Sequence, residues 1–68
     1  MARVMENVSG LWWTEQDEMI ADLEALEYEV LEVNDEYVTV LDTLADVEII
    51  FYLGHANRTM WIERFKEV

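Results

Sequence analysis

The side chains of this chain that could do chemistry are mostly carboxylates. Sixteen Asp and Glu face four Lys and Arg, which gives a formal net charge of −12 over 68 residues. Paired carboxylates can serve as general acid and base, and clustered ones can bind hard cations. A chain of 68 residues leaves little room for a substrate cleft. The segment Asn34-Asp35-Glu36 lacks the alternating acidic spacing and the glycine of a calcium loop. We therefore expect a turn there, and no metal site.

The remaining reactive residue types give no recognisable constellation either. His55 is the only histidine and follows Gly54, with no second His nearby. The absence of Cys excludes a thiol nucleophile, a disulfide framework and a Cys-based zinc site. We expect no catalytic residue, no cofactor and no enzymatic activity.

The charge is unevenly distributed along the chain. From Val4 to Asn57 there are 14 acidic residues and no Lys or Arg, whereas Arg58, Arg64 and Lys66 lie in the last 11 positions. Direct nucleic-acid binding needs clustered basic residues, so we expect none. An acidic body is instead attracted to a basic protein surface at long range. The expected partner is therefore a basic nucleic-acid-binding protein or complex.

The carboxylates need elements to position them, and the clearest element is a helix over residues 15–27. Thr14 is a suitable N-cap, and Asp17 at the third helical position approximates a capping box. Helical spacing places one apolar stripe on a single face, formed by Met19, Ile20, Leu23 and Leu26. The opposite half carries five acids and no basic residue; these acids are Glu15, Asp17, Glu18, Asp22 and Glu24.

The sequence after this helix is rich in β-branched and aromatic residues. It predicts strands over 28–33, 37–42, 47–53 and 59–65, with loops at 34–36 and 54–57. The spacing in 59–65 also permits a helix, although its composition favours a strand. Alternation would place Arg64 on one strand face with Met60 and Ile62, which suggests a cross-strand salt bridge.

The first 13 residues allow two interpretations. One is a short helix through Val4, Met5 and Val8 that ends at Gly10, and the other is an edge strand through residues 11–13. The predicted fold class is α+β: a single small domain with one amphipathic helix on a three- to four-stranded antiparallel sheet.

Adjacent tryptophans add an apolar element to the predicted binding surface. Trp12 and Trp13 cannot both face one core, so one ring is expected to pack inside and the other to stay partly exposed. Tryptophan is enriched among residues that anchor interfaces. The predicted partner-binding residues are Trp12, Trp13, Asp17, Glu18, Asp22, Glu24, Glu29 and Glu32.

In its basic-free stretch from Val4 to Asn57 and its acidic helix over 15–27, the chain resembles the small acidic inhibitors that phages encode against host nucleic-acid machinery. This class includes DNA mimics such as anti-CRISPR proteins, uracil-DNA glycosylase inhibitors and anti-restriction proteins. The resemblance is one of type, without a shared motif, and the Glu-Ser-Ile segment of the glycosylase inhibitors is absent. It implies binding without catalysis, in which carboxylates occupy the basic groove that nucleic acid would fill.

Two other interpretations remain open. The chain could be a structural or regulatory interaction module that uses Trp12, Trp13 and Trp61, with a homodimer formed through Trp12 and Trp13, or it could be a salt-adapted acidic domain. The sequence shows no 18-residue apolar stretch and no signal-peptide pattern at its start. We expect no membrane association and a cytoplasmic location, in the host cell if the protein is phage-encoded.

Overall fold

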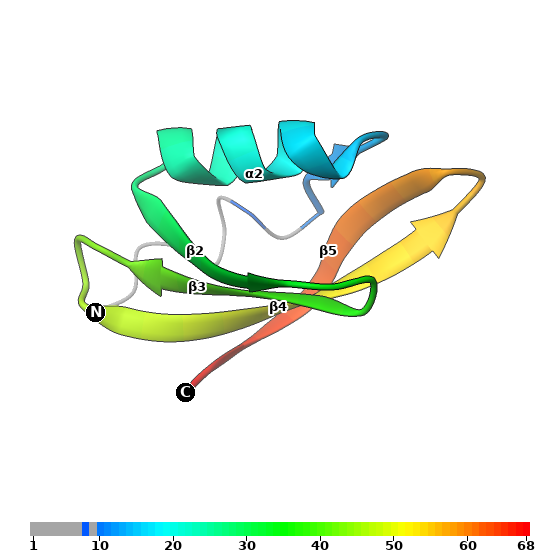
Figure 1. Ribbon diagram of the computed structural model, residues 1–68. Helices are drawn as coiled ribbons and strands as arrows, with labels where there is room; N and C mark the ends of the chain where they lie inside the picture. The colour runs from blue at the N-terminus through cyan, green and yellow to red at the C-terminus, as the bar shows by residue number, and fades with distance from the viewer. Residues whose placement is uncertain (1–7, 9) are drawn as a thin grey trace.

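The computed structural model describes residue 8 and residues 10–68, which form helix α2 and a five-stranded antiparallel sheet (Figure 1). The elements are β1 (Trp12–Trp13), α2 (Gln16–Ala25), β2 (Tyr28–Val33), β3 (Tyr37–Asp42), β4 (Val47–Ala56) and β5 (Thr59–Glu67). The predicted α+β class is confirmed, with five strands in place of three to four.

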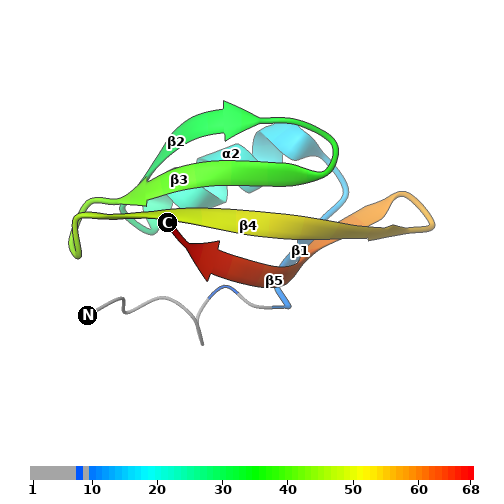
Figure 2. The same cartoon turned by 90° about the horizontal axis from the view of Figure 1, so that it is seen from below.

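The order of the strands explains how the helix covers the sheet. The sheet runs β1-β5-β4-β3-β2, so β1 and β2 lie at opposite edges although they are consecutive strands in the chain. Helix α2 joins them and therefore crosses one face of the sheet from edge to edge (Figure 1). Seen from below in Figure 2, the sheet lies in front of α2, and among the described residues no helix covers the face turned away from α2. We call the face toward α2 the inner face and the other the outer face.

The helix is shorter than predicted at both ends. Glu15, rather than Thr14, is the N-cap, with extended backbone (φ −125°, ψ 135°) and no side-chain hydrogen bond to the first turn. The predicted Thr14 cap is therefore wrong. At the other end, Leu26 donates to the carbonyl groups of Asp22 and Leu23. Glu27 then adopts a left-handed conformation (φ 70°), which turns the chain into β2.

The last two strands are longer than predicted. The sequence predicts a loop at 54–57, but β4 continues to Ala56 and β5 begins at Thr59. Only Asn57 and Arg58 form the turn. Gly54 is a strand residue that pairs with Trp61, so its presence does not mark a loop here. The strand interpretation of 59–65 is confirmed, and the helical alternative is wrong.

The described part of the N-terminal region contains a short edge strand. Trp12 and Trp13 form β1 and pair with Trp61 and Met60 of β5, which confirms the edge-strand interpretation. Of the short helix predicted through Val4, Met5 and Val8, the first two residues lie outside the described part of the chain, and Val8 is described and helical.

The core fills the space between α2 and the inner face. Met19 and Leu23 of α2 are fully buried, and Tyr28 packs edge-on against Phe51 with ring centroids 5.7 Å apart. The buried apolar residues are Val8, Trp13, Met19, Leu23, Tyr28, Val38, Val40, Ile49, Phe51, Leu53 and Ile62. Because α2 contributes two of these anchors, its solvent-facing side is held in a fixed position relative to the sheet.

A β-bulge in β5 changes which side chains share a face. Tyr52 pairs with Arg64 and Leu53 pairs with Ile62, so Glu63 is the additional residue. Buried Ile62 points to the inner face, and the bulge places Arg64 on the outer face beside Tyr52. The predicted grouping of Arg64 with Ile62 is therefore wrong, because simple alternation does not hold across a bulge.

Candidate binding surfaces

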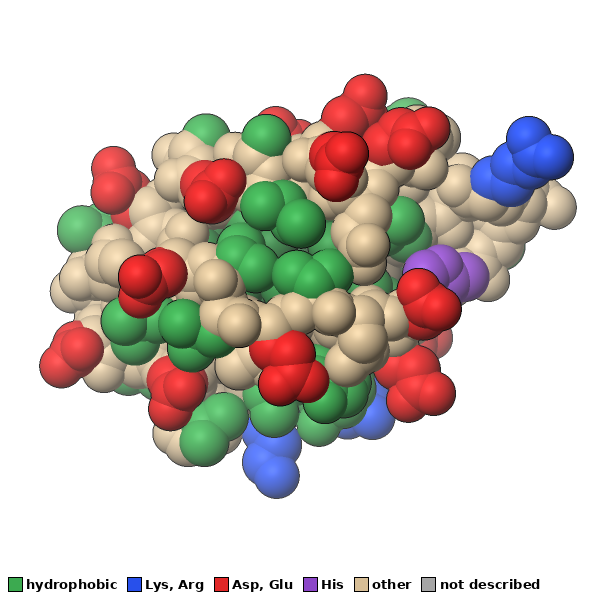
Figure 3. Space-filling view, in the orientation of Figure 1, with side chains coloured by type: hydrophobic (Ala, Val, Ile, Leu, Met, Phe, Trp, Pro, Cys, Tyr) green, Lys and Arg blue, Asp and Glu red, His purple; other side chains and the backbone are tan. Residues whose placement is uncertain are grey.

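The solvent-facing side of α2 is the first candidate surface. The carboxylates of Asp17, Glu18, Asp22 and Glu24 are all exposed, and the helix contains no basic residue. Asp17 and Glu24 are seven residues apart and therefore lie on one stripe, two turns from each other. We call Asp17, Glu18, Asp22 and Glu24 the acidic helix face. In Figure 3 the charged side chains that line the helix side are red, whereas blue side chains lie at the lower edge and at the hairpin tip.

Asp22 differs from the other three acids because it also supports the fold. Its Oδ2 accepts a hydrogen bond of 2.7 Å from the indole Nε1 of Trp13. This bond joins the middle of α2 to strand β1. Asp22 therefore has a structural role that Asp17, Glu18 and Glu24 do not show.

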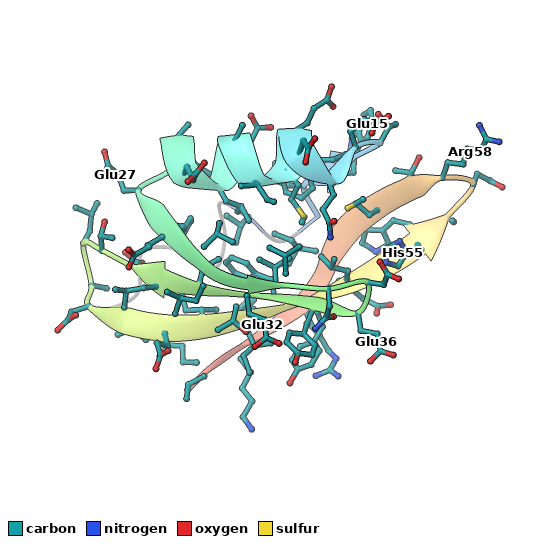
Figure 4. The ribbon with its side chains drawn as sticks, viewed as in Figure 1. Glu15, Glu27, Glu32, Glu36, His55 and Arg58 are labelled. Atoms are coloured by element: carbon teal, nitrogen blue, oxygen red, sulfur yellow. The ribbon has the colours of Figure 1, made fainter. Side chains whose placement is uncertain are left out.

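Glu29 and Glu32 do not join the acidic helix face. Their partners across the β2–β3 ladder are Leu41 and Thr39, on the outer face of the sheet. Figure 4 shows Glu32 below the sheet, on the opposite side from Glu15 and Glu27 near the helix. The structure thus brings together the four helical members of the predicted set and places the two strand members on another face.

The hydrogen bond between Glu32 and Tyr37 sets the local chemistry of this outer edge. The Tyr37 hydroxyl donates to Glu32 Oε2 over 2.9 Å. This bond to a carboxylate raises the pKa of Tyr37 above its ordinary value, and the nearby negative charges add to the effect. Glu32 is therefore engaged within the protein.

The two adjacent tryptophans are separated as expected. Trp13 is 5% exposed and belongs to the core, whereas Trp12 is 64% exposed on the outer face. Of these two tryptophans, only Trp12 is available as an anchor for a partner.

The sequence analysis grouped Trp61 with Trp12 and Trp13 in the interaction-module alternative, but it did not predict that Trp61 lies next to Trp12. Trp61 pairs directly with Trp12 across β1 and β5, and both lie on the outer face. Together with Gly10 and Thr59 they line an open pocket of about 430 Å³, which we call the tryptophan pocket. The signal available in the sequence was Gly54 within an otherwise β-forming run, because a strand glycine often marks a site where a neighbouring group approaches closely.

Further aromatic contacts continue along the outer face. The guanidinium carbon of Arg64 lies 3.8 Å from the ring centroid of Tyr52, a cation–π contact. The Tyr52 ring in turn lies 6.5 Å from that of Tyr37. The outer face therefore carries aromatic rings together with both basic and acidic side chains, whereas the acidic helix face carries no basic residue.

Neither a metal centre nor a membrane segment is found in the part of the chain that the structure describes. Within residues 8 and 10–68 no group of three or more His, Asp or Glu side chains could hold a metal ion. His55 lies near the end of β4, where its Nε2 is 2.7 Å from the carbonyl oxygen of Asp35 (Figure 4). Among these residues no helix has both the length and the apolar character needed to span a bilayer.

Comparison with protein-family models, with curated proteins and with solved structures finds no match. The functional interpretation therefore depends on the geometry of the acidic helix face and the tryptophan pocket.

Proposed function

We propose that the protein is a non-catalytic inhibitor whose acidic helix face competes with DNA or RNA for the basic surface of a nucleic-acid-binding protein. An effector complex of the CRISPR type is one such target, as the resemblance to anti-CRISPR proteins implies. The observation that carries the proposal is a helix with four exposed carboxylates and no basic residue, held in place by the buried side chains of Met19 and Leu23.

The spacing of these carboxylates supports nucleic-acid mimicry. From Asp17 to Glu24 the helix rises about 10 Å, at about 1.5 Å per residue. Measured along the helix axis, the four acids are therefore about 3.5 Å apart on average. One DNA strand has a similar axial rise of about 3.4 Å per phosphate. A groove that binds phosphates would be complementary to this row.

The test is a charge reversal that leaves the fold contacts intact. The variant Asp17→Lys/Glu24→Lys alters one stripe of α2 and spares Asp22. The control, Glu29→Lys/Glu48→Lys, makes the same change in net charge on the outer face, where both residues are exposed. Each immobilised variant is incubated with a bacterial cell extract, washed with increasing salt and eluted with duplex DNA.

The wild type and the control should retain nucleic-acid-binding proteins that duplex DNA displaces, and the helix variant should lose them. Retention should also fall steeply with salt, because exposed charges are screened beyond about 8 Å at physiological ionic strength. Unchanged capture by the helix variant, or capture that DNA does not displace, would contradict the proposal.

The exposure of Trp12 favours a second candidate, a protein-interaction module that forms a homodimer. With Trp13 buried, such a dimer would use Trp12 and its neighbour Trp61. Sedimentation over a range of concentrations distinguishes the two: a dimer that Trp12→Ala dissociates favours the module, and a monomer contradicts it.

A further inference from the structure

The tryptophan pocket has one wall whose position is fixed by the fold. Trp61 pairs with Gly54, and a Cβ placed on Gly54 would lie only 2.6 Å from Cε2 of the Trp61 indole. The indole therefore lies against the backbone of β4, in space that only glycine leaves open. This close approach orients the ring at the surface of the sheet.

The second wall is Trp12, which is held at the sheet edge by backbone hydrogen bonds on its N-terminal side. The Gly10 N–H donates to the carbonyl of Ile62 over 3.0 Å, and the Ile62 N–H donates to the carbonyl of Leu11 over the same distance. The backbone of Trp12 is thus anchored while its ring remains 64% exposed. The result is a pocket with two indole walls at fixed positions in the sheet.

The chemistry of the walls selects a cationic, planar group. None of the described lining residues, Gly10, Trp12, Thr59 and Trp61, carries a charge. A net charge of −12 attracts cations and repels anions such as phosphate. Indole faces bind cations more strongly than other aromatic rings, and a guanidinium is planar and more weakly hydrated than an ammonium group. An arginine side chain satisfies these conditions best.

The outer face already contains an example of this interaction. Arg64 stacks on Tyr52 at 3.8 Å, on the strand that also carries Trp61. We propose that the tryptophan pocket binds an arginine side chain of the basic partner protein. This inference depends on the proposed function, which identifies the partner as a protein with a phosphate-binding groove. Such a groove contains arginine side chains that could enter the pocket.

The position of the pocket allows one partner to contact both surfaces. Only Thr14 and Glu15 separate β1 from α2, and α2 contacts β1. Trp12 therefore lies at the sheet edge from which α2 begins, close to the first acids of the acidic helix face. A partner that covers this edge would meet carboxylates and the pocket together.

The experiment titrates the full chain with short capped peptides that differ in one side chain: arginine, lysine or the neutral analogue citrulline. The indole N–H signals of Trp12 and Trp61 are followed by NMR. The arginine peptide should shift both signals, the lysine peptide should bind more weakly, and the citrulline peptide should leave them unchanged. Trp12→Ala should weaken arginine binding about tenfold, as expected for loss of a cation–π wall.

Trp12 is exposed, so its replacement should leave the fold intact, and the spectrum of Trp12→Ala verifies this. Equal shifts with citrulline would overturn the inference, because they would show an apolar pocket without preference for charge. A lack of shifts, or a dimer that covers the pocket and excludes the peptide, would also overturn it.

The outcome is separable from that of the proposed function. The variant Asp17→Lys/Glu24→Lys should still show shifts at both tryptophans with the arginine peptide, because its pocket is unchanged. If that variant captures the same DNA-displaceable proteins as the wild type and still binds the arginine peptide, the proposed role of the acidic helix face is wrong and the proposed arginine site is unaffected. If the wild type does not bind the arginine peptide but captures DNA-displaceable proteins, the proposed arginine site is wrong and the proposed function is unaffected.

Discussion

The indole of Trp13 and the carboxylate of Asp22 form a hydrogen bond of 2.7 Å that joins the edge strand β1 to helix α2. One of the acids in the helix is therefore part of the fold. This bond explains why a row of carboxylates that looks uniform in the sequence contains members with different roles. It also decides which acids can be replaced when the binding surface is tested.

Replacement of Asp22 by Ala should lower the free energy of unfolding by about 1–3 kcal/mol, because the largely buried Trp13 indole loses its acceptor. The matched control is Glu24→Ala, which removes an exposed acid for which no side-chain hydrogen bond is seen and should change stability by less than about 0.5 kcal/mol. Urea denaturation measures both values. Equal values for the two variants would show that the hydrogen bond does not contribute.

Gly54→Ala should destabilise the protein by about 1–3 kcal/mol, because the added Cβ would lie 2.6 Å from the Trp61 ring and displace it. The displacement should also change the tryptophan emission spectrum. In a Trp61→Ala background the same substitution should cost much less, since the obstructing ring is gone. A double-mutant cycle measures this coupling, and additive effects of the two substitutions would refute the close approach.

Periodicity was sufficient to predict α2 and β3, because their buried residues follow spacings of 3.6 and 2. Strand β2 was predicted from its composition, since a register shift between Val30 and Glu32 interrupts its alternation. Periodicity failed where a single residue interrupts the pattern. The bulge at Glu63 moves Arg64 to the other face, and Gly54 resembles a loop residue until its cross-strand partner is known. The burial of Asp42, whose Oδ1 accepts the N–H groups of Leu44 and Ala45, likewise depends on how the turn after β3 closes.

The sequence predicted the acidic helix face better than it predicted the residues of the outer face. The acids of α2 share a face because helical spacing alone requires it. Glu29 and Glu32 were grouped with them, but both lie on the outer face of the sheet. Simple alternation would put residues three apart on opposite faces, and the register shift between Val30 and Glu32 brings these two to the same one. The pairing of Trp12 with Trp61 joins residues 49 positions apart in the chain, since 61 − 12 = 49, and strand order alone determines it. Within the sequence, Gly54 indicates a close approach in its strand but does not identify Trp12 as the neighbour of Trp61.

The phenol of Tyr37 should titrate above its ordinary range in the wild type and at lower pH in Glu32→Gln, because the bond to the Glu32 carboxylate holds its proton. Since the pKa is raised in the folded state, its stabilising contribution is present below pH about 10 and is lost as pH rises through the folded-state pKa. NMR with labelled tyrosine follows the titration, and Tyr37→Phe identifies the signal. The same titration in wild type and Glu32→Gln would contradict this assignment.

Arg58→Gly should stabilise the β4–β5 hairpin by about 0.5–1 kcal/mol. Asn57 and Arg58 both have positive φ, 51° and 67°, in a two-residue turn between paired Ala56 and Thr59. Such turns favour Asn followed by Gly, because a side chain in the left-handed region costs about 1–2 kcal/mol, part of which the greater entropy of unfolded glycine offsets. Thermal unfolding should show a higher midpoint for this variant. The control Arg58→Ala removes the same charge but keeps a Cβ, so an equal rise in both variants would attribute the gain to charge and not to backbone conformation.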